Sequence, residues 1–181
     1  MKGISAHASE PYKGINPILK LIDIYEKLIK IYKLPKSEDD FKTCINLSKL
    51  NGGEAVNMVP STASMVLDIR FVKEDTIDSI ISTIKTVNEG VEINVLDQGP
   101  TFHVDHTLPI MKNFISEASK ILKHDIKIKK YVATSDAIYF SEKNIPTILM
   151  NPIGDYLHNP KEYVDINSLY TLYKIFKLLL L

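Results

Sequence analysis

Residues 1–16, which read MKGISAHASEPYKGIN, place a histidine in a turn of small residues ahead of a helix. The histidine is His7, and the helix would start behind Pro11 and Gly14. An imidazole can act as a catalyst or as a metal ligand, but a lone histidine is more often a polar residue at the end of a strand. Taken alone, this segment favours the second interpretation.

A second polar cluster lies in NPIGDYLHNPKEYV, residues 151–164, directly after a short apolar strand. Loops at the carboxyl ends of strands are where open α/β sheets build their sites. His158 is therefore a candidate metal ligand, since a neutral imidazole nitrogen suits zinc, and Glu162 is a candidate partner that orients it. The alternative is that Glu162 and Asp165 only cap the final helix or complement its charge.

A third cluster, ATSDAIYF at residues 133–140, also follows a predicted strand. It concentrates two hydroxyls and a carboxylate, those of Thr134, Ser135 and Asp136, which could face a substrate. An Asx or Ser/Thr turn that opens a helix is at least as good an explanation for these residue types.

Two polar residues, Asn57 and Arg70, remain. Asn57 lies in GGEAVNMVP, just before Pro60, where a turn-forming asparagine is the default interpretation. Arg70 alternates with Asp68 in LDIRF, a pattern typical of a cross-strand salt bridge on a solvated face. The functional alternative for Arg70 is a planar fork that grips a substrate carboxylate, which a lysine could not replicate.

The composition is that of a globular chain without a charge bias. The 181 residues are 45% hydrophobic, and 22 Lys and Arg balance 22 Asp and Glu, which argues against a nucleic-acid or anionic-membrane partner. Cys44 is the only cysteine, and no apolar leader opens the chain, so we expect a cytoplasmic protein without an intrachain disulfide. The terminal run YTLYKIFKLLLL is too short for a bilayer and predicts a docking helix.

The elements that would position these residues follow a regular order in the first half. Helical spacing predicts an amphipathic helix over 16–33, and a second one follows over 74–88. Alternation predicts strands at 43–53 and 62–72, joined as an antiparallel pair, and another at 91–96. With a short strand at the start, this is the split βαβ order, which gives a four-stranded antiparallel, ferredoxin-like sheet with two helices on one face.

The second half alternates between strands and helices. A helix over 107–123, strands at 126–132 and 145–150, and a last helix predict part of a parallel sheet. Two strands are few for an independent α/β layer, because such sheets need both faces covered. The fold class expected for the whole chain is α/β (α+β), with an antiparallel first half and a partial parallel second half.

Taken in order, four stretches resemble the signatures of one family. They are GISAHASEPYKGIN, GGEAVNMVPSTASMVLDIR, ATSDAIYF with NIPTILMNP, and HNPKEYVDINSL, and they span nearly the whole chain. The family is that of the zinc-dependent exopeptidases and deacylases, which includes aminoacylase, succinyl-diaminopimelate desuccinylase, carboxypeptidase G and the bacterial di- and tripeptidases. The resemblance implies a lid, or dimerisation, domain over residues 1–98 and the carboxyl-terminal part of the catalytic domain over residues 99–181.

The resemblance implies roles for the polar residues of the lid. His7 matches a histidine that, in dimeric members, reaches the neighbouring subunit's active site and stabilises the developing oxyanion. Such a donor commonly contributes about 2.7 to 4 kcal/mol to the transition state. Asn57 and Arg70 match residues that hold the carboxylate end of the substrate.

In the second half, the resemblance makes His158 the last metal ligand, with Glu162 beside it, and residues 134–136 the substrate-facing loop. Ala133 replaces the glycine that often precedes this loop, which removes a position suited to close backbone approach. Members of the family also carry a histidine and aspartate pair, a bridging aspartate and a glutamate doublet before the lid. None of these precedes Met1, so we expect a fragment of the enzyme.

For the intact enzyme, the resemblance implies hydrolysis of the amide bond of a short peptide or an N-acyl amino acid. Two zinc ions would polarise the carbonyl and activate water, and a glutamate would accept the proton. This chain alone is expected to be inactive and to form a homodimer through the lid. The alternative is a non-catalytic dimerisation or interaction module that associates through its edge strand.

Overall fold

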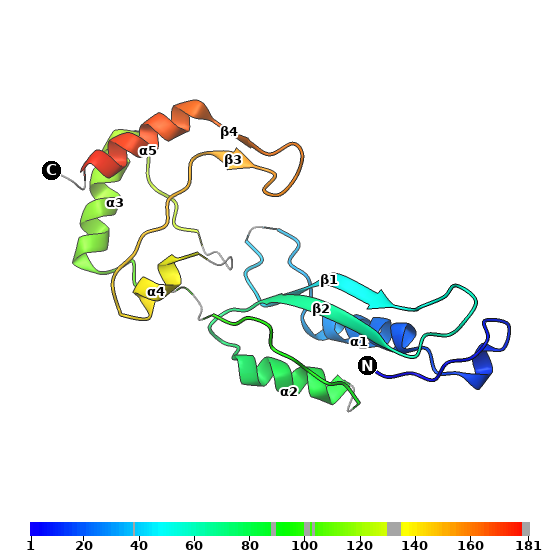
Figure 1. Cartoon of the computed structure of the whole chain (residues 1–181). Coiled ribbons are helices and arrows are strands. Elements are labelled where there is room, and N and C mark those ends of the chain that lie inside the picture. Colours follow the sequence, from blue (N-terminus) through cyan, green and yellow to red (C-terminus); the bar gives the residue numbers. More distant parts are fainter. Residues whose placement is uncertain (38, 88–89, 100–101, 103, 130–134, 179–181) are drawn as a thin grey trace. The chain divides into compact units, whose positions relative to one another are not determined.

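The computed structural model describes residues 1–181 except 38, 88–89, 100–101, 103, 130–134 and 179–181. The described residues form two compact units, unit 1 within residues 1–101 and unit 2 from residue 102 onward (Figure 1). None of the described helices is both long enough and apolar enough to cross a membrane.

Unit 1 contains two helices that begin at side-chain caps. The first, α1 (Pro17–Ile31), follows a short 3-10 turn, η1 (Pro11–Lys13), and starts behind Asn16, whose side chain accepts a hydrogen bond from the N–H of Ile18 at 2.9 Å. The second, α2 (Ile77–Val87), starts where the Thr76 hydroxyl accepts a bond from the N–H of Ser79 at 3.1 Å. Both helices confirm the sequence prediction.

The sheet of unit 1 is an antiparallel pair, as the alternation predicts. β1 (Cys44–Gly52) runs against β2 (Ala63–Arg70), with Cys44 opposite Arg70 and Gly52 opposite Ala63. Alternate residues of both strands face α1 and α2, so the core lies between the helices and one face of the pair. The buried residues of this core are Leu21, Ile24, Leu28, Ile45, Ala63, Ile80 and Ile84.

The predicted four-stranded sheet is not confirmed. Residues 1–8 contact the chain near the start of β2 through isolated bridges, such as Lys2 with Thr62, and segment 91–96 has no strand pairing among the described residues. A strand forms only where a neighbour satisfies its backbone groups, and the amino-terminal segment reaches β2 no further than Ala63. Val91 and Ile93 still pack on the core, which accounts for the alternation seen in the sequence.

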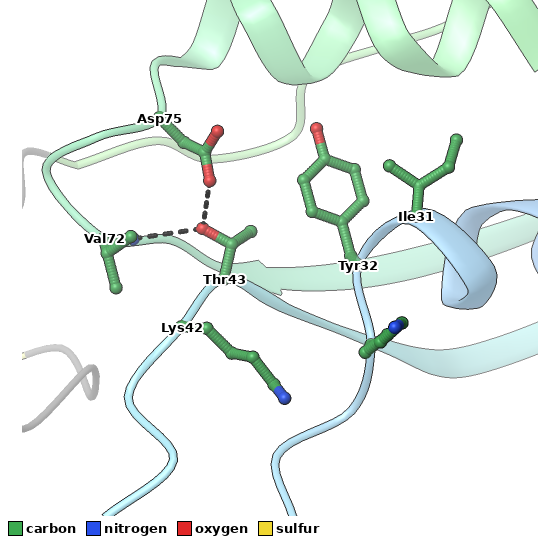
Figure 2. A pocket seen from close by; sticks show the side chains of 7 residues that line it. Ile31, Tyr32, Lys42, Thr43, Val72 and Asp75 are labelled. Atoms are coloured by element: carbon green, nitrogen blue, oxygen red, sulfur yellow. Dashed lines mark hydrogen bonds between the residues drawn. The ribbon is translucent and has the colours of Figure 1, made fainter.

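A buried threonine ties β1 to the turn before α2 (Figure 2). Thr43 is 4% exposed, and its hydroxyl donates a hydrogen bond to Asp75 and accepts one from the N–H of Val72 at 3.2 Å. The hollow around it is also lined by Ile31, Tyr32, Lys33 and Lys42. Because both bonds of Thr43 are made within unit 1, they explain its burial without a ligand.

The described part of unit 2 consists of three helices and one short hairpin. Helix α3 (Pro109–Leu122) packs against α5 (Ile166–Leu178), and between them the chain forms α4 (Ala137–Ser141) and the pair β3 (Gly154–Asp155) and β4 (Tyr163–Val164). Helix α3 confirms the helix predicted over 107–123. The buried core that joins α3 and α5 is small, and it consists of Phe114, Ala118 and Ile175.

The partial parallel sheet predicted for this half is absent from the described residues. Residues 126–129 and 145–150 form no strand, and the single sheet described in unit 2 is antiparallel. A parallel strand needs neighbours on its edges and cover on its faces, and neither segment has a strand partner among the described residues. Residues 130–132 of the first predicted strand lie outside the described residues. Ile126 and Met150 pack against the small core, whereas Ile128, Ile145, Ile148 and Leu149 are exposed, so burial within the described residues accounts for only part of the apolar pattern.

Candidate functional site

His7 lies where the amino-terminal segment meets the loop between β1 and β2. The N–H of Ala8 donates to the carbonyl of Asn57 at 2.9 Å, and the N–H of Val59 donates to the carbonyl of Ala6 at 2.8 Å. His7 itself pairs with Met58 across an antiparallel bridge. Backbone hydrogen bonds therefore fix the residues before and after His7, while the side chain of His7 is exposed.

The imidazole of His7 is bonded to the turn that follows it. Its Nδ1 lies 2.7 Å from the hydroxyl of Ser9 and accepts a bond from the N–H of Ser9 at 3.2 Å. The turn is closed by the N–H of Glu10, which donates to the carbonyl of His7 at 2.9 Å. His7 is thus more ordered than a strand-end residue that only touches water. The sequence prediction did not include Ser9, although a hydroxyl two residues after a histidine in a turn is a usable signal.

Asn57 lies beside His7 through the same backbone pairing. Its carbonyl is engaged by Ala8, and the residue is exposed. A hollow on this side of unit 1 is lined by Ile18, Val56, Met58 and Pro60, with Glu54 at its margin. The structure therefore brings Asn57 and His7 together at one end of unit 1, beside an apolar surface.

Arg70 lies at the opposite end of β2. Arg70 is seven residue steps along the strand from Ala63, which at the rise of a strand is about 23 Å, and His7 lies on the other side of Ala63. The Nε of Arg70 is 2.7 Å from Oδ1 of Asp68, and Nη2 of Arg70 donates a hydrogen bond to Oδ2 of Asp68 at 2.8 Å. The ion pair predicted for Arg70 is present, but it runs along one strand instead of across two.

The residues predicted to form a substrate-facing loop lie at the start of α4, where Ser135 stabilises the first turn. The hydroxyl of Ser135 accepts a hydrogen bond from the N–H of Ala137 at 3.1 Å, which is the turn that opens α4. Asp136 makes no side-chain cap at this helix and is exposed. Thr134 lies outside the described residues.

His158 lies in the loop between β3 and β4. Its N–H donates to Oε2 of Glu162 at 3.1 Å, so the carboxylate contacts the backbone of His158 rather than its ring. His158 and Tyr156 both have positive φ, 64° and 63°, a conformation that is uncommon for side-chain-bearing residues. Asp165 caps α5 by accepting from the N–H of Asn167 at 2.9 Å, as the alternative interpretation of this cluster expects.

The described residues do not by themselves fit a metal centre. Among them, no three His, Cys, Asp or Glu side chains lie close enough together to hold an ion. A zinc site needs three or four protein ligands, and His158 offers one imidazole.

Cys44, the single cysteine, lies opposite Arg70 at the start of β1. Partial burial raises the pKa of its thiol above the ordinary value, and the nearby Asp68 carboxylate adds to that rise. Its thiolate fraction at neutral pH is correspondingly small, which does not suit a nucleophile.

The sequence of this chain is similar to those of known hydrolases. Residues 1–94 match the family described as "Peptidase dimerisation domain". The chain is 27% identical over 179 residues to succinyl-diaminopimelate desuccinylase from Sulfurovum sp., covering 97% of this chain and 48% of that protein. It is 25% identical to a [LysW]-lysine/[LysW]-ornithine hydrolase from Saccharolobus solfataricus, covering 93% and 47%.

Solved structures give the same fold. A tripeptidase from Staphylococcus aureus superposes with a TM-score of 0.69 at 22% identity, covering 96% of this chain and 47% of that one. An M20 family metallo-carboxypeptidase from Sulfolobus solfataricus gives a TM-score of 0.66 at 17% identity, covering 97% and 54%. The chain spans about half the length of the relatives it matches.

Proposed function

The chain belongs to the peptidase dimerisation domain family, and from this premise we propose that it supplies the dimerising lid and the last metal ligand of a metal-dependent amidohydrolase. Residues 1–98 are the lid, and residues 99–181 are the carboxyl-terminal part of the catalytic domain. The bond cleaved is the amide of a short peptide or an N-acyl amino acid. This chain alone is inactive, because most ligands of the metal centre lie outside it.

The separation of His7 from Arg70 is the single observation that carries this proposal. Both residues bind one small substrate in the proposed reaction, yet more than about 20 Å of strand lies between them within unit 1. One substrate cannot contact both residues of the same lid. A site that uses both must therefore take Arg70 from one subunit and His7 with Asn57 from its partner.

A twofold dimer of lids supplies that arrangement. The outer edge of β1 has no strand partner among the described residues, and an antiparallel contact between two copies of it would bring opposite ends of the two lids together. Each substrate would then be held by the Arg70 guanidinium at its carboxylate, while His7 of the other copy donates to the oxyanion.

His158 is the contribution of unit 2 to the metal centre. It lies in the loop between β3 and β4, which the bond from its N–H to Glu162 closes and which precedes the Asp165 cap of α5. When bound, the metal ions, expected to be zinc, supply Lewis-acid polarisation of the scissile carbonyl. His158 offers one ring nitrogen for this, and Glu162 fixes the backbone that carries it.

Reconstitution tests the proposal. This chain joined to the amino-terminal half of the Sulfurovum desuccinylase should hydrolyse N-acyl amino acids or short peptides, and a chelator should abolish turnover. Without that half, the chain should form dimers in light scattering at high micromolar concentration and should bind no stoichiometric zinc.

The competing function is a non-catalytic dimerisation module, which the unpartnered edge of β1 favours. A joined protein that dimerises and binds metal yet cleaves no amide would support that module. The same result would contradict the hydrolase, because every part that the proposal requires would then be in place.

A further inference from the structure

We propose that Ser9 is a positioning residue for His7: the N–H and the hydroxyl of Ser9 bond Nδ1 of the imidazole and hold the neutral ring in the tautomer that carries its proton on Nε2. The inference rests on the proposed function, in which His7 donates a hydrogen bond to the reaction's oxyanion. It goes beyond that function by naming the group that makes the donor available.

The backbone contact decides which nitrogen carries the proton. A hydroxyl can donate or accept, so the 2.7 Å contact between Oγ of Ser9 and Nδ1 is compatible with either tautomer. A backbone N–H can only donate, so the 3.2 Å contact requires a lone pair on Nδ1. With Nδ1 as the acceptor, a neutral imidazole must carry its proton on Nε2.

The turn makes this arrangement local and rigid. Glu10 closes the turn on the carbonyl of His7, and Ala8 is tied to Asn57, so residues 7–10 present Ser9 to the ring at a fixed place. Nε2 has no hydrogen-bond partner within the described part of the chain, and the side chain is exposed. The proton on Nε2 is therefore directed away from the turn, where a ligand could accept it.

His124 provides a matched reference in the same chain. Its Nδ1 lies 3.0 Å from the carbonyl oxygen of Asp125, which can only accept. That contact favours the opposite tautomer, with the proton on Nδ1. Two exposed histidines of one protein are thus expected to differ in tautomer because their backbone partners differ in kind.

Nitrogen-15 NMR of this chain, labelled at histidine and recorded at alkaline pH, tests the assignment. His7, identified by its loss in His7→Gln, should show an unprotonated Nδ1 and a protonated Nε2, and His124 should show the reverse. Ser9→Ala removes the hydroxyl donor and keeps the backbone N–H, so it should move His7 only part of the way toward a mixture of tautomers, whereas Ser9→Thr, which keeps both donors, should leave the tautomer unchanged. A protonated Nδ1 on His7 would overturn the inference, and no response to Ser9→Ala would overturn the part that it gives to the hydroxyl.

In the joined enzyme, Ser9→Ala should lower kcat by about three- to tenfold with KM unchanged, the effect of one hydrogen bond. A normal kcat in Ser9→Ala while His7→Ala is inactive would overturn the role of Ser9 and leave that of His7 intact. A normal kcat in His7→Ala would instead remove the proposed function, whatever the tautomer of the ring.

Discussion

The two units of this chain hold their functional residues in different ways. In unit 1, the N–H of Ala8, next to His7, donates to the carbonyl of Asn57, and the sheet beside these residues packs on two helices. In unit 2, His158 lies in an exposed loop closed by two pairs of residues. The candidate residues of unit 1 are thus ordered by long-range pairing within that unit, whereas the position of His158 depends on short-range contacts.

The surfaces of the two units support this distinction. Helix α5 keeps a run of apolar and aromatic side chains exposed, and these are Ile166, Leu169, Tyr170, Tyr173 and Phe176. Helix α1 exposes Leu19 and Ile31 as well, but it buries Leu21, Ile24 and Leu28. In the described part of α5, by contrast, Ile175 is the one buried residue. Exposed apolar area on one helix face is typical of a surface that another protein segment covers. Unit 1 therefore resembles an independent domain more closely than unit 2 does.

The largest predicted effect is the loss of stability caused by a cavity in a buried core, and it should differ between unit 1 and unit 2. Ile24 and Ile175 are equally buried, at 0% and 1%, so Ile24→Ala and Ile175→Ala form a matched pair. Ile24→Ala should lower the free energy of unfolding of unit 1 by about 2 to 5 kcal/mol, and Ile175→Ala should cost unit 2 less, since fewer buried neighbours surround it. Hydrogen exchange resolved by residue measures both changes. Loss of protection in both units from either substitution would show that they unfold as one.

A smaller effect is expected at the helix caps. Asn16 caps α1 in unit 1 and Asp165 caps α5 in unit 2, each through the N–H two residues later. Asn16→Ala and Asp165→Ala should each cost about 1 kcal/mol, measured as the shift of the urea midpoint, and Asn16→Asp and Asp165→Asn should cost little. Asp165→Ala should also speed exchange in the loop of His158. An unchanged loop would mean that α5 does not position His158.

The smallest predicted effect is a shift in the pH dependence of Cys44 alkylation, which tests the packing of the sheet beside Arg70. Because burial raises the pKa of the Cys44 thiol, the rate of its alkylation should rise with pH later than that of a free cysteine. The same chain unfolded in urea is the control, and there the midpoint should return to the ordinary value. A midpoint below that of the unfolded chain would contradict the packing of Cys44 on β1.

Sequence periodicity predicts the local elements well and the pairing of strands less well. The helices of unit 1 and the pair β1 and β2 follow from spacing and alternation within about 30 residues. Segments 91–96, 126–129 and 145–150 alternate or are apolar too, but a strand needs a partner, and that partner is a matter of tertiary structure. The hairpin of β3 and β4 lies in a stretch that polar and turn-forming residues mark as a loop.

For the candidate site, the types of the residues predict more about which residues belong to it than their spacing in the sequence does. The proximity of His7 to Asn57 depends on pairing across about 50 residues of chain, which no local pattern shows. The ion pair of Asp68 with Arg70 is a local feature, and alternation indicates it. The distance between His7 and Arg70 follows only from the length of β2, and it gives the proposal its dimeric form.

Subunit mixing of the joined enzyme tests this composite site most directly. Alone, His7→Ala should lower kcat by on the order of a hundredfold, and Arg70→Ala should act mainly on KM, because a carboxylate is held in the ground state and the transition state alike. Mixed in equal amounts and assayed at a substrate concentration well below KM, where both parent variants are slow, the two variants should recover about a quarter of the wild-type activity, since half of the dimers would pair one intact site with one doubly defective site. Mixed dimers that form but show no more activity than the parent variants would place His7 and Arg70 in the same subunit's site and contradict the account.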